Sequence, residues 1–436
     1  MKITVVGTGY VGLVAGVCFA EKGHNVICYD INEEKINTMK KGISPIYETG
    51  LQELMRKNNE AGRIQYTTDY REAYRDSDFI FIGVGTPERA DGSANLDYVY
   101  EAALQIAQNI EKDCIVVIKS TVPIGTNDDI EKYIRKNLKN NIKIDVASNP
   151  EFLAQGQAVK DTLEPSRIVI GTENKKTEQK MLELYSNFDA PKLTTDRRSA
   201  EMVKYASNDF LALKISYIND IANLCEVVGA NIEDVAKGMS YDNRIGDKFL
   251  KAGCGYGGSC FPKDTKALHY LASQGGYELK TVKAAIEVNK NQKLILLQKA
   301  RQKFRTFKGV NIAVLGLAFK PGTDDLREAP SLDNVSVFID EGANIKAYDP
   351  IAEKNYKKKF PIQIEYTNSP EEALKDADVC FIFTEWNEIK KVKPDEYSKL
   401  MKKALVYDGR NIYDISEMEN ANVEYYSVGR KCSIKT

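Results

Sequence analysis

The sequence predicts an α/β protein in which two Rossmann-like, doubly wound domains are joined by a long central helix. Short apolar strands alternate with helix-like stretches over residues 2–148, and the same alternation returns from residue 310 onward. Between them, residues 199–228 contain no Gly or Pro and show helical periodicity. Because 436 residues are too many for one core, we expect domains at 1–198, 199–305 and 306–436.

The chain opens with a β–loop–α–β unit. Residues 2–6 form an apolar strand, residues 14–22 a helical run and residues 25–30 a second strand. A Gly-x-Gly-x-x-Gly pattern at residues 7–12 lies between the strand and the helix, where glycines let a pyrophosphate approach the helix N-terminus. The alternative interpretation is a glycine-rich turn with a structural role only.

An acidic residue, Asp30, ends the second strand 18 positions after Gly12. A carboxylate at this point accepts hydrogen bonds from a ribose diol and repels a 2′-phosphate. The pattern therefore favours NAD over NADP, and Lys35 is a candidate for contacting the same ribose.

Further strands and helices continue the alternation. The strands are predicted at residues 79–84, 114–119 and 145–148, and the helices at 98–109 and 128–137. Thr86 and Thr121 lie in loops that follow two of these strands, on the side where such sheets bind ligands. We expect their hydroxyls to line the nicotinamide end of the cofactor, although each loop is also typical of an ordinary turn. Glu151 follows the next strand and Pro150, and is either directed into the cleft or solvated.

The long central helix carries Lys204 and Asn208 on one face, because their spacing is i, i+4. One interpretation is that Lys204 and Asn208 are a solvated pair on the protein surface. A cation and an amide donor together also suit a developing oxyanion. The length of the helix predicts a subunit interface, and a second helix is predicted over residues 281–304.

The segment at residues 253–264 is the most informative in the chain. Four glycines precede Cys260, and Lys263 and Asp264 follow it. Glycines give the backbone freedom to wrap closely around a ligand, and a thiol beside a lysine can ionise to a nucleophilic thiolate. The usual interpretation of a lone cysteine is a small buried apolar side chain, which is how we interpret the other seven.

The second α/β domain is predicted from four strands that resemble those of the first half in order. They lie at residues 311–316, 344–348, 379–384 and 405–408. Tyr348-Asp349 ends the second of them, as Tyr29-Asp30 does in the first half.

Composition excludes several classes of function. The net charge of −1 gives no electrostatic case for nucleic acid or an acidic membrane, and no apolar run is long enough to span one. The start of the chain goes directly into a strand, so we expect no secretory signal and a cytoplasmic protein with reduced thiols. With only His24 and His269 present, we expect no metal site, and proton chemistry falls to Lys, Asp, Glu, Cys or water.

Taken together, these motifs resemble the UDP-glucose 6-dehydrogenase family, within the UDP-glucose/GDP-mannose dehydrogenases. The resemblance covers nearly the whole chain, and the Gly-Ser-Cys-Phe-Pro-Lys-Asp stretch at residues 258–264 is its most specific part. The other matching segments are 7–12, 45–48, 120–125, 149–153, 204–208, 214–216, 244–246 and 319–327.

The resemblance implies a four-electron oxidation of a sugar C6 alcohol to a carboxylate with two NAD⁺. It implies that Cys260 attacks the intermediate aldehyde to give a thiohemiacetal, which a second hydride transfer converts to a thioester that water hydrolyses. Lys204 and Asn208 would stabilise the C6 oxygen, and Asp264 would manage protons. Thr121 and Glu151 would position the water.

The resemblance also implies binding residues. For the cofactor, these are Gly7, Gly9, Val11, Gly12, Asp30, Lys35, Thr86, Thr121, Gln155, Lys263 and Arg327. For UDP-glucose, they are Glu151, Phe152, Leu153, Lys204, Asn208, Arg244, Phe249, Leu250, Lys251, Ala252, Gly253, Gly257 and Lys320, with Arg244 supplied by the neighbouring subunit of a homodimer.

Two residues depart from the family pattern. Gln155 stands where a second Glu is usual, and it cannot ionise; Thr49 stands where Pro is frequent. Two alternatives stay open: a UDP-N-acetylhexosamine 6-dehydrogenase, and a nucleotide-sugar-binding regulator without catalysis. A short-chain epimerase is disfavoured, because no Tyr-x-x-x-Lys occurs.

Overall fold

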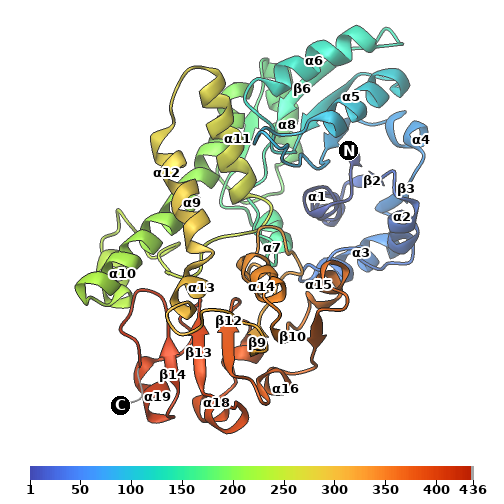
Figure 1. Cartoon of the computed structure of the whole chain (residues 1–436). Coiled ribbons are helices and arrows are strands. Elements are labelled where there is room, and N and C mark those ends of the chain that lie inside the picture. The colour runs from blue at the N-terminus through green and yellow to red at the C-terminus, as the bar shows by residue number, and fades with distance from the viewer. Residues whose placement is uncertain (434–436) are drawn as a thin grey trace. The chain divides into compact units, whose positions relative to one another are not determined.

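A computed structural model describes residues 1–433, which fall into two compact units: one from Met1 to Ser207, and one from Asn208 to the end of the described residues. Helix α9 (Arg197–Val228) begins in the first unit and ends in the second (Figure 1). No helix among the described residues is both long and apolar enough to cross a membrane.

The first unit is built on an eight-stranded sheet of order β3-β2-β1-β4-β5-β6-β7-β8. Every neighbouring pair is parallel except β6 and β7, which are antiparallel. The strands are β1 Lys2–Val6, β2 Asn25–Tyr29, β3 Ile64–Thr67, β4 Phe79–Ile82, β5 Cys114–Ile118, β6 Ile144–Ser148, β7 Ile168–Gly171 and β8 Lys192–Thr195.

Helices cover both faces of this sheet, so the doubly wound prediction is confirmed. One apolar cluster packs α1, α2, α3, α7 and α8 against the strands, and a second packs α4, α5 and α6 on the other face. Figure 1 shows α5 and α6 side by side. The helices are α1 Tyr10–Glu21, α2 Glu33–Lys40, α3 Leu51–Glu60, α4 Tyr70–Tyr74, α5 Asp97–Asn109, α6 Thr126–Asn137, α7 Ala158–Leu163 and α8 Lys175–Leu184.

The glycines at residues 7–12 have different surroundings. Gly12 packs closely against backbone, whereas the space next to Gly9 is open. A Cβ on Gly12 would lie 2.0 Å from the carbonyl oxygen of Gly7, whereas a Cβ on Gly9 would meet nothing within 4 Å. Gly7 itself has a φ of +90°. Helix α1 begins at Tyr10, four residues before the predicted start, because Gly9 is its N-cap.

The second unit joins the central helices to a six-stranded parallel sheet of order β11-β10-β9-β12-β13-β14. A single core packs apolar residues of α9, α10 and α13 against these strands. The three-domain division of the sequence stays a prediction. The strands are β9 Asn311–Leu315, β10 Asn344–Tyr348, β11 Ile364–Tyr366, β12 Val379–Ile382, β13 Leu405–Asp408 and β14 Glu424–Tyr426.

The helices of the second unit follow the chain in two groups. The central group is α10 Ile232–Ser240, α11 Phe261–Gln274, α12 Lys280–Gln292 and α13 Ile295–Ala300. The group around the sheet is α14 Pro330–Asp340, α15 Glu353–Lys359, α16 Pro370–Leu374, α17 Asn387–Lys390, α18 Pro394–Leu400 and α19 Ile415–Asn420.

The prediction of one helix over residues 281–304 was wrong, because α12 ends at Gln292 and α13 starts at Ile295. At the break, the side chain of Asn334 donates a hydrogen bond of 2.8 Å to the carbonyl oxygen of Lys293. A side chain that takes a backbone carbonyl out of the helical ladder is a known cause of such interruptions.

We expect Gly12→Ala to lower the free energy of unfolding by about 3 kcal/mol, because the new methyl group would collide with backbone rather than with a flexible side chain. The matched control is Gly9→Ala, whose methyl group enters open space, and we expect a change of less than about 1 kcal/mol. Chemical denaturation of both variants measures the difference. Equal destabilisation would contradict the packing role of Gly12.

Candidate active site

The glycine-rich loop at residues 253–259 is held along its backbone by the second unit. The Gly253 N–H donates to Asn219 Oδ1, and its carbonyl accepts from Gln292 Nε2, both at 2.8 Å. The Asn289 side chain bonds both backbone groups of Tyr256, at 2.8 and 3.0 Å. These contacts hold the loop backbone against α9 and α12.

The glycines of this loop are needed for packing against the protein itself. A Cβ on Gly257 would lie 2.4 Å from the carbonyl oxygen of Glu328, and a Cβ on Gly258 would lie 2.7 Å from the Phe319 ring. Gly255 also has a φ of +83°. The sequence prediction that the glycines serve close ligand contact is not tested by these distances, but they give a second reason for glycine here.

Cys260 is the N-cap residue of α11 and is half-buried, with its sulfur 3.7 Å from Ser259 Oγ. The positive end of a helix dipole stabilises a thiolate at this position. Other cysteines lie in apolar surroundings that disfavour ionisation: burial raises the pKa of Cys18 and of Cys28 to about 12. Among the cysteines, only Cys260 and Cys432 are partly exposed.

Asp264 lies in the first turn of α11, is fully buried and is held on both oxygens. Lys263 Nζ donates to Oδ1 at 2.5 Å, and Asn208 Nδ2 donates to Oδ2 at 2.6 Å. The structure therefore joins three predicted site residues in one hydrogen-bonded group within the second unit, in which Asn208 and Asp264 are buried and Lys263 is partly exposed. Lys263, predicted to contact NAD, is paired with Asp264 here.

A second carboxyl near this group was missed from the sequence. Asp209 is 4% exposed, and neither of its oxygens has a hydrogen-bond partner. Burial, together with the charge of Asp264, raises the pKa of Asp209 to about 8. The only signal in the sequence was its place next to Asn208 on a predicted helix.

Lys204 and Glu151 form a buried ion pair of 2.8 Å in the first unit. Burial opposes ionisation of Glu151, but the charge and hydrogen bond of Lys204 outweigh it and hold the pKa of Glu151 below its usual value. The Leu153 N–H also donates to Glu151, at 2.8 Å. The guanidinium of Arg167 lies over the Phe152 ring, with its Cζ atom 3.8 Å from the centre of that ring.

Lys119 adds a second buried cation beside this pair. Its ammonium donates to Asn149 Oδ1 at 3.0 Å, and burial lowers the pKa of Lys119 to about 8, with the charge of Lys204 acting in the same direction. A cavity of about 230 Å³ is lined by Lys119, Glu151 and Arg167, among others. The sequence signal was a lysine at the end of an otherwise apolar strand, which we interpreted only as the strand end.

Three of the predicted cofactor residues, Asp30, Thr86 and Thr121, follow the carboxyl ends of β2, β4 and β5 in the first unit. Asp30 accepts hydrogen bonds from the backbone and hydroxyl of Thr8, at 2.8 and 2.6 Å, and its pKa is lowered because these donors outweigh the effect of burial. Thr86 Oγ1 donates to the carbonyl of Thr121 at 2.8 Å, so the two predicted loops meet. Gln155 is buried in the loop before α7.

Other predicted residues have partners close in the chain. The exposed side chains of Arg244 and Arg327 pair with Asp242 and Asp325, respectively. Lys320 lies over the Phe319 ring, 5.6 Å from its centre. Lys35 lies in the first turn of α2, while Leu250 and Ala252 are buried in the core of the second unit. Their predicted ligand contacts stay predictions.

Three family models match the chain in order. They describe the NAD binding domain at residues 1–189, the central domain at 198–291 and the UDP binding domain at 313–415 of the UDP-glucose/GDP-mannose dehydrogenase family. The chain belongs to this family. The family assignment makes it an oxidoreductase whose cofactor is NAD.

Known members of the family are similar to this chain over nearly the full length of both proteins. The UDP-glucose 6-dehydrogenase YwqF of Bacillus subtilis is 52% identical, over 100% of this chain and 99% of its own. The UDP-glucose dehydrogenase of the hyperthermophilic archaeon Pyrobaculum islandicum has a TM-score of 0.93 at 35% identity, over 99% and 98%. The UDP-D-ManNAc dehydrogenase of Pyrococcus horikoshii has a TM-score of 0.87 at 28% identity, over 99% of both chains.

The described residues 1–433 contain no group of three or more His, Cys, Asp or Glu side chains arranged to hold a metal ion. The polar groups of the candidate site are instead a thiol, carboxylates, lysines and amides.

We expect the low pKa of Lys119 to make folding stability rise with pH. Between about pH 8, where folded Lys119 loses its proton, and its ordinary value of 10.5, the unfolded chain binds more protons than the folded one. The difference in unfolding free energy between wild type and Lys119→Met should therefore grow with pH over this range. The control is Lys132→Met, whose side chain is 77% exposed. If the difference in unfolding free energy between wild type and Lys119→Met did not change with pH over this range, the lowered pKa of Lys119 would be contradicted.

Proposed function

We propose that this protein oxidises UDP-glucose at C6 to UDP-glucuronate, in two successive hydride transfers to two NAD⁺ with Cys260 as the covalent nucleophile. The observation that carries the proposal is a half-buried thiol at the N-terminus of α11, one turn before a buried Asp264 that Asn208 and Lys263 hold in place. Full-length identity of 52% to a UDP-glucose 6-dehydrogenase supports the choice of substrate.

The residues of the first unit fit the NAD that the family implies. Space is open at Gly9, and close packing at Gly12 brings the backbone of residues 7–12 to the start of α1, where a pyrophosphate is stabilised. Asp30 is an ionised acceptor at the end of β2, suited to a ribose diol. When bound, NAD⁺ accepts the hydride from C6.

In the first oxidation, the C6 hydroxyl loses its proton as the hydride leaves, and an aldehyde forms. Lys204 supplies positive charge to the C6 oxygen while Glu151 holds its ammonium in place. Asn208 is one helical turn from Lys204 on α9 and donates one amide hydrogen to Asp264, which leaves its second for the substrate oxygen.

In the second oxidation, the Cys260 thiolate bonds to the aldehyde carbon and gives a thiohemiacetal, which loses a second hydride to become a thioester. Water then adds to the thioester carbon, the C–S bond breaks, and the carboxylate and thiol are released. Asp264 receives the protons of these steps, and Thr121 and Glu151 orient the water. Gln155 contributes hydrogen bonds only, because an amide does not ionise.

A homodimer and a cytoplasmic location are part of this proposal. Large apolar side chains on α9, together with one residue just after α10, are more than half exposed within the second unit, which supports a subunit interface. They are Phe210, Tyr217, Leu224, Val227, Val228 and Tyr241. Within residues 1–433 the structure has no disulfide between cysteines, and reduced thiols are usual in cytosolic proteins.

Two other functions are less well supported. A UDP-N-acetylhexosamine 6-dehydrogenase is the nearest alternative, but the similar UDP-D-ManNAc dehydrogenase is only 28% identical. A non-catalytic regulator would not require the buried Lys204–Glu151 and Asn208–Asp264 pairs. Purified protein with NAD⁺ and either UDP-glucose or UDP-N-acetylglucosamine tests all three. We expect two NADH per UDP-glucose and none from the second sugar nucleotide; binding without NADH would overturn the proposal.

We expect Cys260→Ser to reduce steady-state turnover at least about 100-fold, because a serine hydroxyl does not ionise to an equivalent nucleophile. The thermal midpoint should stay near that of wild type, since the side chain is half-buried and nearly isosteric. Stopped-flow NADH absorbance and product analysis measure the effect. The matched control is Cys432→Ser, at the other partly exposed cysteine. Two NADH per sugar at the wild-type rate in Cys260→Ser would exclude the covalent step.

A further inference from the structure

Helix α9 buries a row of polar side chains where an apolar stripe is usual. Arg197, Glu201 and Lys204 are spaced i, i+4, i+7, so they share one face of the helix, and each is 6% exposed or less. Buried charges are stable only when each is paired. Lys204 is paired with Glu151. Arg197 and Glu201 have partners of their own, which show how the start of α9 is held.

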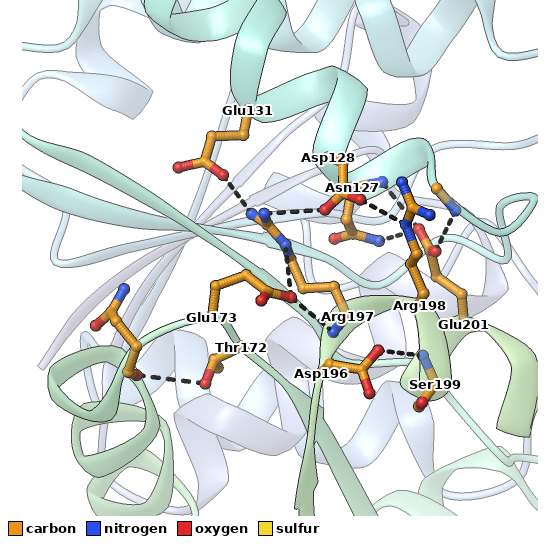
Figure 2. A network of polar contacts seen from close by, with 12 residues as sticks. Asn127, Asp128, Glu131, Thr172, Glu173, Asp196, Arg197, Arg198, Ser199 and Glu201 are labelled. Atoms are coloured by element: carbon orange, nitrogen blue, oxygen red, sulfur yellow. Dashed lines mark hydrogen bonds and ion pairs between the residues drawn. The ribbon is translucent and has the colours of Figure 1, made fainter.

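Arg197 is clamped by three carboxylates of the first unit, as Figure 2 shows. Its guanidinium lies 2.9 Å from Asp128, 2.6 Å from Glu131 and 3.5 Å from Glu173. The adjoining cavity of about 390 Å³ is lined by charged residues, most of which pair with one another. We therefore interpret this cluster as an anchor for the start of α9 rather than as a ligand site.

Glu201 makes the next contact, with the N-terminus of α6. Its Oε2 accepts the Gly125 N–H at 2.6 Å, and its Oε1 accepts the backbone N–H of Asn127 at 2.8 Å and its side-chain amide at 2.6 Å (Figure 2). Gly125 is the N-cap of α6, has a φ of +95° and offers no side-chain acceptor. Glu201 thus supplies the helix cap that the local sequence lacks.

Gly125 is the last residue of the loop that joins β5 to α6, residues 119–125, which we call the Thr121 loop. Its start is held by Ser120 Oγ, which donates to the Val84 carbonyl at 2.6 Å, and by the hydrogen bond from Thr86 to the Thr121 carbonyl. Its end is held by Glu201, which lies three residues before Lys204 on α9. A single carboxylate therefore links the Thr121 loop to the turn of helix that presents Lys204.

We propose that Glu201 is a positioning residue that fixes the Thr121 loop and Lys204 relative to each other. This inference rests on the proposed function, since both groups are assigned there to the C6 chemistry. Displacing a reacting group by about 1 Å can cost about 100-fold in rate. Glu201→Gln keeps the shape of the side chain but puts an –NH₂ in place of one of the two oxygens, so the hydrogen bonds that this oxygen accepts from N–H donors are lost.

The test compares Glu201→Gln with wild type in steady-state NADH formation from UDP-glucose. We expect kcat to fall at least about 10-fold, with the dissociation constant for NAD⁺ changed less than two-fold. Hydrogen exchange at Gly125 and Asn127 should accelerate. The matched control is Asp78→Asn, which also removes a carboxylate that accepts a backbone N–H, from Lys2 at 2.8 Å, at the amino end of the same sheet. It should leave kcat unchanged.

A double-mutant cycle with Thr121→Ala separates positioning from general destabilisation. If Glu201 acts through the loop, its substitution should have a much smaller effect on kcat in the Thr121→Ala background. Equal effects in both backgrounds, or a wild-type kcat in Glu201→Gln, would overturn the inference. Asn127→Ala removes one donor to Glu201 and is the milder variant if Glu201→Gln does not fold. Failure of the wild type to form NADH would instead overturn the proposed function.

Discussion

The candidate site depends on the pairing of charges buried along one face of α9. Arg197, Glu201, Lys204 and Asn208 follow each other at intervals of three or four residues, and each has a polar partner within hydrogen-bond or ion-pair distance. Removing a partner would leave a buried charge uncompensated, at a cost of about 3–5 kcal/mol. This constraint fixes the rotation of the helix within the first unit, and with it the direction in which Lys204 projects.

Helix N-termini provide the second recurring element. Cys260 begins α11, the Gly7–Gly12 turn begins α1, and Glu201 caps α6. Each end concentrates unpaired N–H groups and a partial positive charge, which stabilise a thiolate, a pyrophosphate or a carboxylate. A chain with two histidines still has thiol, carboxyl and amine groups for the proposed oxidation, and burial and neighbouring charges shift the pKa values of Lys119 and Glu151 among them.

Local patterns predicted the long helix, five strands of the first sheet and four of the second, but not β3, β7, β8, β11 or β14. They failed at residues 293–294, where Asn334, some forty residues downstream, interrupts a helix that the periodicity predicts as continuous. They also gave one reason for the glycines at 253–258, whereas the structure adds contacts with Phe319 and Glu328. Both involve partners distant in sequence, which no local pattern contains.

The sequence by itself determined the doubly wound folds and predicted Asp30 and Cys260 as site residues, because alternation, glycine spacing and a rare residue context are local properties. Only the tertiary structure decided which polar groups are buried away from solvent. It placed Lys119 beside Glu151, Asp209 near Asp264 and Glu201 at the start of α6. Burial and pairing depend on segments brought together by folding, and they shift the pKa values of Lys119 and Asp209.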